Sequence, residues 1–132
     1  MINSSVCRSY LMEAVEGVHS SKDEYRMALY KPGAKLDRET TSYSAEGECV
    51  GLGYPAGGIK LENMKFSRVG GGLGVKFDDV LIQNCSISAG GCLVYNASKQ
   101  NKSVAVFAFQ NQVKSVNGKF SVSFPGNWFS IS

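Results

Sequence analysis

The sequence predicts a mainly β fold, an antiparallel β-sandwich or jelly roll with one N-terminal α-helix. Apolar residues recur at three- and four-residue spacing only over residues 4–18, and from residue 24 onward they alternate with polar residues in short runs. Turn signals separate nearly all of these runs. The 15 glycines, against only 3 prolines, also favour many turns between short strands.

Length and composition indicate one folded domain. A chain of 132 residues can bury one hydrophobic core, so we expect a single domain over 1–132, with the helix at 4–18 and the sandwich at 24–132. The 14 basic and 11 acidic residues are scattered and give a net charge of +3, without the basic cluster of a nucleic-acid-binding protein. No apolar stretch approaches the roughly 20 residues that span a bilayer. The scattered charge and the missing span predict neither a nucleic-acid nor a membrane partner, and the N-terminus, which lacks a signal-peptide pattern, predicts synthesis in a cytoplasm.

The predicted helix carries a single apolar stripe. Ser4 or Ser5 is the expected N-cap, and Gly17 with His19 is expected to end the helix. An isolated helix of this length is marginal in water, so its stripe must be buried against the domain or against another chain. Tyr10 and Leu11 are therefore candidate contact residues. The stripe consists of Cys7, Tyr10, Leu11, Ala14, Val15 and Val18.

The alternating runs predict a strand of about seven residues around Tyr25 to Tyr30, followed by a polar loop at 34–46 anchored by Leu36 and Tyr43. Asn117-Gly118 is a favoured hairpin turn, and Gly70-Gly71-Gly72 is the other sharp turn signal. Further strands are expected at 49–52, 59–66, 73–77, 80–88, 92–95, 103–109, 120–124 and 128–131.

No cluster of residues in the sequence indicates catalysis or metal binding. His19 is the only histidine, and at a helix end it is expected to stabilise the terminus. Asp78-Asp79 lacks the further oxygen ligands of a calcium loop, and the glycines at 70–74 lack the lysine of a phosphate-binding loop. We therefore expect no enzyme, no cofactor and no metal. The cysteines fit no zinc spacing and are expected to be free thiols: Cys7, Cys49, Cys85 and Cys92.

The segment from Gly47 to Gly58 is the most informative part of the chain, because it holds five glycines, a proline and a tyrosine. Glycine allows positive φ and close approach of neighbouring chains, so we expect a rigid connection that positions a sheet edge for contact with another protein. No charged group is expected beside Tyr54 to tune its hydroxyl proton, which favours packing over catalysis. Tyr54, Gly57 and Gly58 are further candidate contact residues.

A series of short stretches is distributed over most of the chain: Glu16-Gly17-Val18-His19, Ala28-Leu29-Tyr30, Gly53-Tyr54, Phe77-Asp78-Asp79-Val80, Leu93-Val94-Tyr95-Asn96 and Asn117-Gly118-Lys119-Phe120. Their order and spacing resemble a family of small structural proteins from tailed bacteriophages, described as virion, head-decoration or capsid-associated proteins. The chain departs from that pattern at Gly90-Gly91-Cys92, where similar proteins commonly carry an arginine, and at Gly126-Asn127-Trp128, which replaces a longer loop.

The resemblance implies a non-enzymatic virion protein, made in the host cytoplasm, that binds the capsid exterior and stabilises it. Its partners would be the major capsid protein, further copies of itself in a dimer or trimer, or both. The alternative within a virion is a head–tail joining or tail component. An alternative of another class is a carbohydrate-binding β-sandwich, in which Trp128, Tyr54 and Tyr95 form an exposed aromatic platform. Trp128 is therefore also a candidate contact residue.

Overall fold

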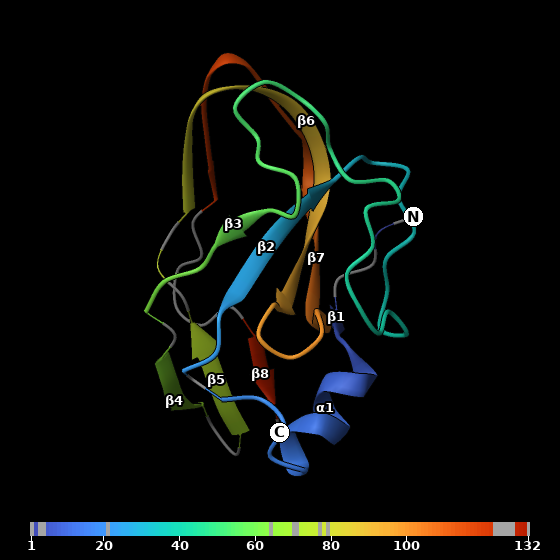
Figure 1. Ribbon diagram of the computed structural model, residues 1–132, viewed down its shortest axis with the longest axis vertical. Coiled ribbons are helices and arrows are strands. Elements are labelled where there is room, and N and C mark those ends of the chain that lie inside the picture. Colours follow the sequence, from blue (N-terminus) through green and yellow to red (C-terminus); the bar gives the residue numbers. More distant parts are fainter. Residues whose placement is uncertain are drawn as a thin grey trace.

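The computed structural model of the protein is mainly β, with two antiparallel sheets and one short helix (Figure 1). It describes residues 2, 5–20, 22–63, 65–69, 72–76, 78, 80–122 and 129–131. The elements are β1 (Ser5–Val6), α1 (Arg8–Val15), β2 (Tyr25–Tyr30), β3 (Ile59–Lys60), β4 (Lys65–Val69), β5 (Gly72–Lys76), β6 (Val80–Asn96), β7 (Lys102–Val122) and β8 (Phe129–Ile131). The larger sheet has the order β1-β7-β6-β2-β3, and the smaller has the order β4-β5-β8. The predicted mainly β, antiparallel class with one helix is thus confirmed.

Helix α1 is shorter than predicted at its N-terminal end. Ser5 and Val6 form β1 and pair with β7, so Ser5 is not the N-cap, and Ser4 lies outside the described residues. Sheet pairing overrides the helical spacing there. At the other end Gly17 has a φ of +76°, and the Val18 amide donates to the Glu13 carbonyl at 2.9 Å. This arrangement is a Schellman-type ending and confirms the role predicted for Gly17.

Two long strands, β6 and β7, replace the four shorter strands predicted over the same residues. They run side by side and bend over together at the top of Figure 1. The prediction of a hairpin at Asn117-Gly118 is wrong, because Gly118 lies inside β7 and pairs with Cys85. Gly90 and Gly91 do not end β6 either; a Cβ on Gly90 would lie 2.5 Å from Pro32 Cα. They are sites of close packing within the strand.

Two other predicted strands take a different form. Residues 49–52 form no strand, because the chain turns at Leu52 and Gly53, where Gly53 has a φ of +83°. The strand expected at 59–66 is divided into β3 and β4, which belong to different sheets. Asn63, between them, has a φ of +55°, a conformation that interrupts an extended strand.

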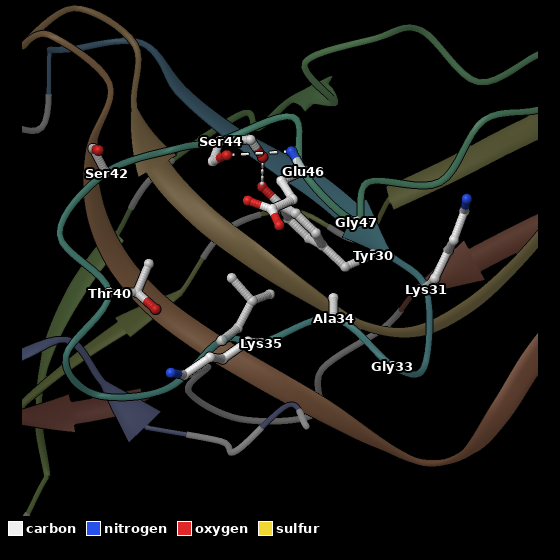
Figure 2. Close-up of a pocket in the computed structure, with 11 residues that line it drawn as sticks. Tyr30, Lys31, Gly33, Ala34, Lys35, Thr40, Ser42, Ser44, Glu46 and Gly47 are labelled. Atoms are coloured by element: carbon white, nitrogen blue, oxygen red, sulfur yellow. Dashed lines mark hydrogen bonds between the residues drawn. The ribbon is translucent and has the colours of Figure 1, made fainter.

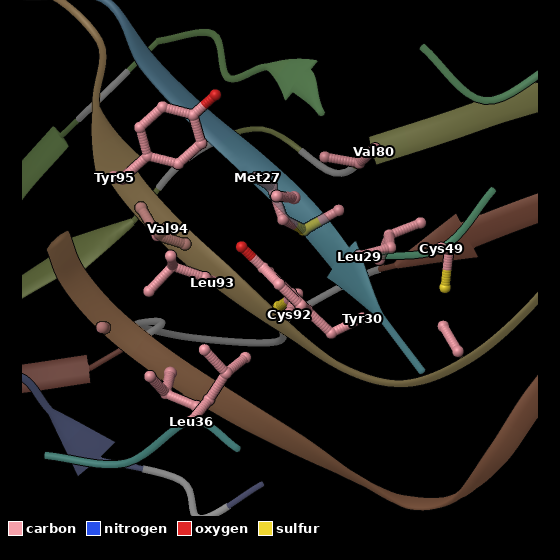
Figure 3. Packing of buried hydrophobic residues seen from close by; sticks show 14 of the residues in the cluster. Met27, Leu29, Tyr30, Leu36, Cys49, Val80, Cys92, Leu93, Val94 and Tyr95 are labelled. Carbon is pink, nitrogen blue, oxygen red and sulfur yellow. The ribbon is translucent and has the colours of Figure 1, made fainter. Parts of the chain in front are cut away.

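The core lies around the centre of the larger sheet (Figure 3). Five of the six residues of β2 are buried, since β2 lies between β6 and β3. The loop at 34–46 carries its predicted anchors: Leu36 is buried and Tyr43 packs partly buried against the core. None of the helices among the described residues is long and apolar enough to cross a membrane.

Candidate functional site

The glycine-rich segment at 47–58 is held by one buried carboxylate. Glu48, which is 6% exposed, accepts hydrogen bonds from the Tyr43 hydroxyl at 2.6 Å, the Tyr54 hydroxyl at 2.5 Å and the Gly57 amide at 3.0 Å. The Tyr95 hydroxyl donates to the Gly57 carbonyl, and the Tyr95 ring stacks on Tyr43 at 4.8 Å. We refer to these five residues as the Glu48 cluster. The cluster closes the segment onto itself and onto β6.

The glycines of this segment allow it to lie directly on the sheet. Gly58 has a φ of +96°, and a Cβ there would lie 2.3 Å from the Met27 carbonyl oxygen of β2. A Cβ on Gly51 would lie 2.0 Å from the Ser86 carbonyl oxygen of β6. The Ser86 amide in turn donates to the Leu52 carbonyl at 2.8 Å. Positive φ and close backbone approach, the two properties predicted from composition, therefore both occur here.

Two apolar side chains alternate with these glycines and face solvent. Val50 is 87% exposed and Leu52 is 69% exposed, whereas Gly51 and Gly53 between and after them press against β6. The backbone of Leu52 lies beside that of Ser86 in β6. Strand β6 pairs in turn with β7, which carries the exposed Val116. We refer to Val50 and Leu52 as the apolar pair. They are the large apolar side chains that the segment exposes to solvent.

The expectation that no charged group lies beside Tyr54 is wrong, because Glu48 contacts its hydroxyl. Burial first, and then the hydrogen bond to Glu48, raise the pKa of Tyr54 well above its usual value. The same hydroxyl accepts from the Leu29 amide at 2.9 Å. This phenol therefore donates within the segment and accepts from β2, so its hydroxyl joins the two.

A second buried polar cluster joins α1 to the end of the larger sheet. His19 Nε2 lies 2.8 Å from Glu13 Oε1, and His19 Nδ1 lies 2.9 Å from Asn96 Nδ2. Asn96 also donates to Asp23 at 2.8 Å, and both Asp23 oxygens accept from Lys99 at 3.0 Å. We refer to these five residues as the His19 cluster. His19 therefore joins the helix to the sheet, a larger role than the helix-end role predicted for it.

The other predicted contact residues occupy varied positions. Tyr10 is 3% exposed and its ring lies 4.7 Å from that of His19, so this stripe residue is buried within the chain, as Cys7 is. Leu11 lies on α1, but its side chain and all of Trp128 lie outside the described part. Tyr54 and Gly58 are buried and Gly57 is half-buried. Contact of these residues with a partner stays a prediction, and burial leaves Tyr10 and Tyr54 little surface for it.

The burial of two tyrosines bears on the predicted carbohydrate-binding platform. Tyr54 and Tyr95 lie in the core, at 8% and 3% exposure, and their hydroxyls bond within the Glu48 cluster. Sugar-binding platforms present an aromatic face to solvent, and these two rings do not. The aromatic platform as predicted is therefore wrong for Tyr54 and Tyr95.

The four cysteines are free and buried, as predicted: Cys7, Cys49, Cys85 and Cys92. Burial raises the pKa of the Cys7 and Cys49 thiols to about 11 and that of Cys92 to about 12. These thiols are protonated at neutral pH and so are poor nucleophiles. Over the described part of the chain, no three histidine, cysteine, aspartate or glutamate side chains are grouped as metal ligands. Asp78 accepts from Asn63 at 2.6 Å, and Asp79 lies outside that part.

An open hollow of about 590 Å³ lies between the end of β2 and the loop at 40–47 (Figure 2). Its walls are fixed, because the Tyr30 hydroxyl donates to the Ser44 carbonyl at 2.6 Å and the Lys31 amide donates to the Gly47 carbonyl at 2.9 Å. Its rim carries charges of both signs, from Lys31, Lys35 and Glu46. The rim therefore favours no single charge class of ligand.

Sequence reasoning missed Glu48, Asn96 and Asp23 as members of buried clusters. One signal was available for Glu48, which is the only charged residue between Gly47 and Gly58. A lone charge among glycines and apolar residues indicates a position with buried hydrogen-bond donors. No such signal exists for Asn96, because its partner His19 is 77 residues away in the sequence.

Comparison with known proteins adds no assignment: no family model, curated protein or solved structure matches this chain. The candidate site is therefore interpreted from its own geometry. The Glu48 cluster uses its polar groups to hold a loop, and the surface that this loop presents is the apolar pair.

Proposed function

We propose that this protein is a non-enzymatic structural component of a tailed-bacteriophage virion, which binds the capsid exterior and stabilises it. The sequence resemblance supplies the class of protein. The observation that carries the proposal is the apolar pair, Val50 and Leu52, held outward by a rigid, hydrogen-bonded segment. The proposed partner is the major capsid protein, with self-association into a dimer or trimer as an addition. A β-sandwich or jelly roll is the proposed finer architecture.

The physical argument is that a rigid apolar projection suits protein–protein contact. Burying one such side chain contributes about 1.5 to 3 kcal/mol. A segment already fixed by Glu48 and by its glycines loses little conformational freedom on binding. A contact this small is weak alone, but the symmetry of a capsid repeats it many times. Weak contacts in large number are sufficient to reinforce a shell.

Binding to capsids that lack this protein tests the proposal. We expect the wild-type protein to co-sediment with them, and the double variant Val50→Ser, Leu52→Ser to bind at least about tenfold more weakly, which corresponds to about 1.4 kcal/mol. Met12→Ser is the matched control, because Met12 is an exposed apolar residue, 68% exposed, on α1 and not on the segment. Unchanged thermal stability of all three proteins would show that the loss reflects binding.

Two results would overturn the proposal: no binding of the wild-type protein to any part of the virion, or equal binding by the wild-type protein and the double variant. Cryo-electron microscopy of decorated particles then separates the two virion positions. Density over the shell supports the capsid exterior. A ring of density on the tail axis would replace it with the head–tail joining or tail alternative.

A further inference from the structure

The hydrogen bonds of Asn96 determine which nitrogen of His19 carries the proton. Asn96 Oδ1 accepts from the Ser98 amide at 3.0 Å, and Asn96 Nδ2 donates to Asp23 Oδ2 at 2.8 Å. Both contacts fix the orientation of the amide, so its second N–H points at His19 Nδ1 at 2.9 Å. Nδ1 must therefore be an acceptor without a proton. The ring proton lies on Nε2, which donates to Glu13 Oε1 at 2.8 Å.

The surroundings of His19 leave no unpaired negative charge for an imidazolium. Lys102 Nζ lies 3.7 Å from Glu13 Oε2, and Lys99 Nζ lies 3.0 Å from both Asp23 oxygens, so each carboxylate already has a lysine beside it. The His19 side chain itself is only 3% exposed. The titratable and charged groups around the ring are Glu13 and Tyr10 from α1, Asp23 from the turn before β2, Tyr25 from β2, Lys99 from the turn after β6 and Lys102 from β7.

We infer that His19 is a proton-sensitive latch, which holds α1 against the sheet as the neutral imidazole and releases it when Nδ1 is protonated. A proton on Nδ1 would face the N–H of Asn96. Turning the Asn96 amide over does not relieve this, because its oxygen would then face the Asp23 carboxylate and its NH₂ would face the Ser98 amide. The docked arrangement thus has no place for the second proton.

The direction of the pH effect follows from proton linkage. A histidine side chain free in water takes up a proton near pH 6.5. If only the released helix binds that proton, the docking of α1 has its full stability above about pH 6.5. Below that pH the equilibrium constant for docking falls, by up to about tenfold for each pH unit. Acidification would therefore weaken the docking of α1 on the sheet.

Nuclear magnetic resonance on the intact protein tests the latch. The chain has a single histidine, so its ring nitrogens are identified without ambiguity. We expect the Nε2–H tautomer at about pH 7.5, and a gain in amide exchange of α1 relative to β2 between about pH 6.5 and 5.5 of roughly fivefold. A cationic ring or the Nδ1–H tautomer at about pH 7.5 would overturn the inference.

His19→Gln is the matched variant, because a glutamine amide can accept from Asn96 and donate to Glu13 but does not titrate. We expect its α1 exchange to show no acid-dependent gain relative to β2. An equal gain in the wild-type protein and the variant would also overturn the inference. If the variant fails to fold, the tautomer and the exchange of the wild-type protein still decide the question.

Discussion

The two buried polar clusters differ in how their charges are compensated. In the Glu48 cluster, one carboxylate is surrounded by neutral donors: two phenols and a backbone amide. In the His19 cluster, each carboxylate lies near a lysine: Asp23 pairs with Lys99, and Glu13 lies 3.7 Å from Lys102, which flanks the cluster. Lys99 reaches the surface with 40% of its side chain exposed. A carboxylate without a cation depends wholly on its hydrogen bonds, whereas paired charges at a surface depend on them far less. The clusters should therefore respond differently to substitution and to pH.

The largest effect is expected from Glu48→Ala. This change leaves the Tyr43 and Tyr54 hydroxyls and the Gly57 amide without their shared acceptor, and we expect a loss of about 3 to 5 kcal/mol in the free energy of unfolding. Urea denaturation measures it. Glu46→Ala is the control, because Glu46 lies exposed in the same loop, and it should cost under about 0.5 kcal/mol. Similar losses in both variants would show that the hydrogen bonds of Glu48 make no specific contribution to stability.

Gly58→Ala should have the next largest effect, since it acts on the same segment through the backbone. The new Cβ would lie 2.3 Å from the Met27 carbonyl oxygen, at a φ of +96°. We expect a loss of about 2 to 4 kcal/mol from overpacking and strain together. Gly33→Ala is the matched control, because no heavy atom lies within 4 Å of a Cβ there. Calorimetric unfolding of both variants compares them, and an unchanged melting temperature for Gly58→Ala would contradict the close packing.

The strands of the fold were only partly predictable from the sequence. Alternating runs gave the β class because side-chain periodicity is local. The length of β6 and β7 was not predictable, because Gly90-Gly91 and Asn117-Gly118 have the composition of turns and only their pairing with distant residues keeps them in strands. Local propensity loses to tertiary pairing at both places.

The candidate site was predictable in its backbone but not in its side-chain partners. The glycines at 47–58 predicted positive φ and close approach of neighbouring backbones, and both occur. The bond between Tyr95 and Gly57 joins residues 38 apart in the sequence. Such a contact depends on strand register, and β6 shifts its register between Val94 and Tyr95. Composition carries no information about that shift.

Alkaline pH should destabilise the Glu48 cluster through its three tyrosines. Burial, and for Tyr43 and Tyr54 the bond to Glu48, raise the pKa values of Tyr43, Tyr54 and Tyr95. A raised folded-state pKa contributes stability that is complete below the unfolded value of about 10 and is lost as the pH rises, by about 1.4 kcal/mol per pH unit for each phenol. Above about pH 10, the free energy of unfolding of Tyr54→Phe should therefore fall by about 1.4 kcal/mol per pH unit less than that of the wild-type protein. Urea unfolding across this pH range measures the slopes, and identical slopes would count against the role of Tyr54.

The smallest effect is expected from Lys99→Met in the His19 cluster. Burial tends to raise the pKa of Asp23, but hydrogen bonds from Asn96, Lys99 and the Ser20 amide outweigh it and lower this pKa. Because Lys99 is 40% exposed, solvent screens the pair and its loss should cost under about 1 kcal/mol near neutral pH.

This cost should also depend on pH in the opposite sense to that of the tyrosines. A lowered folded-state pKa contributes stability that is present above the ordinary aspartate value of about 3.9 and is lost as the pH falls through the folded-state value. The wild-type protein and Lys99→Met should therefore converge as Asp23 becomes protonated. Lys22→Met is the control, because Lys22 is exposed near the same turn and, over the residues that the structure describes, forms no ion pair. Urea unfolding at neutral and acid pH compares the three proteins. A loss above about 2 kcal/mol for Lys99→Met would mean that the His19 cluster, like the Glu48 cluster, depends on a charge that solvent does not screen.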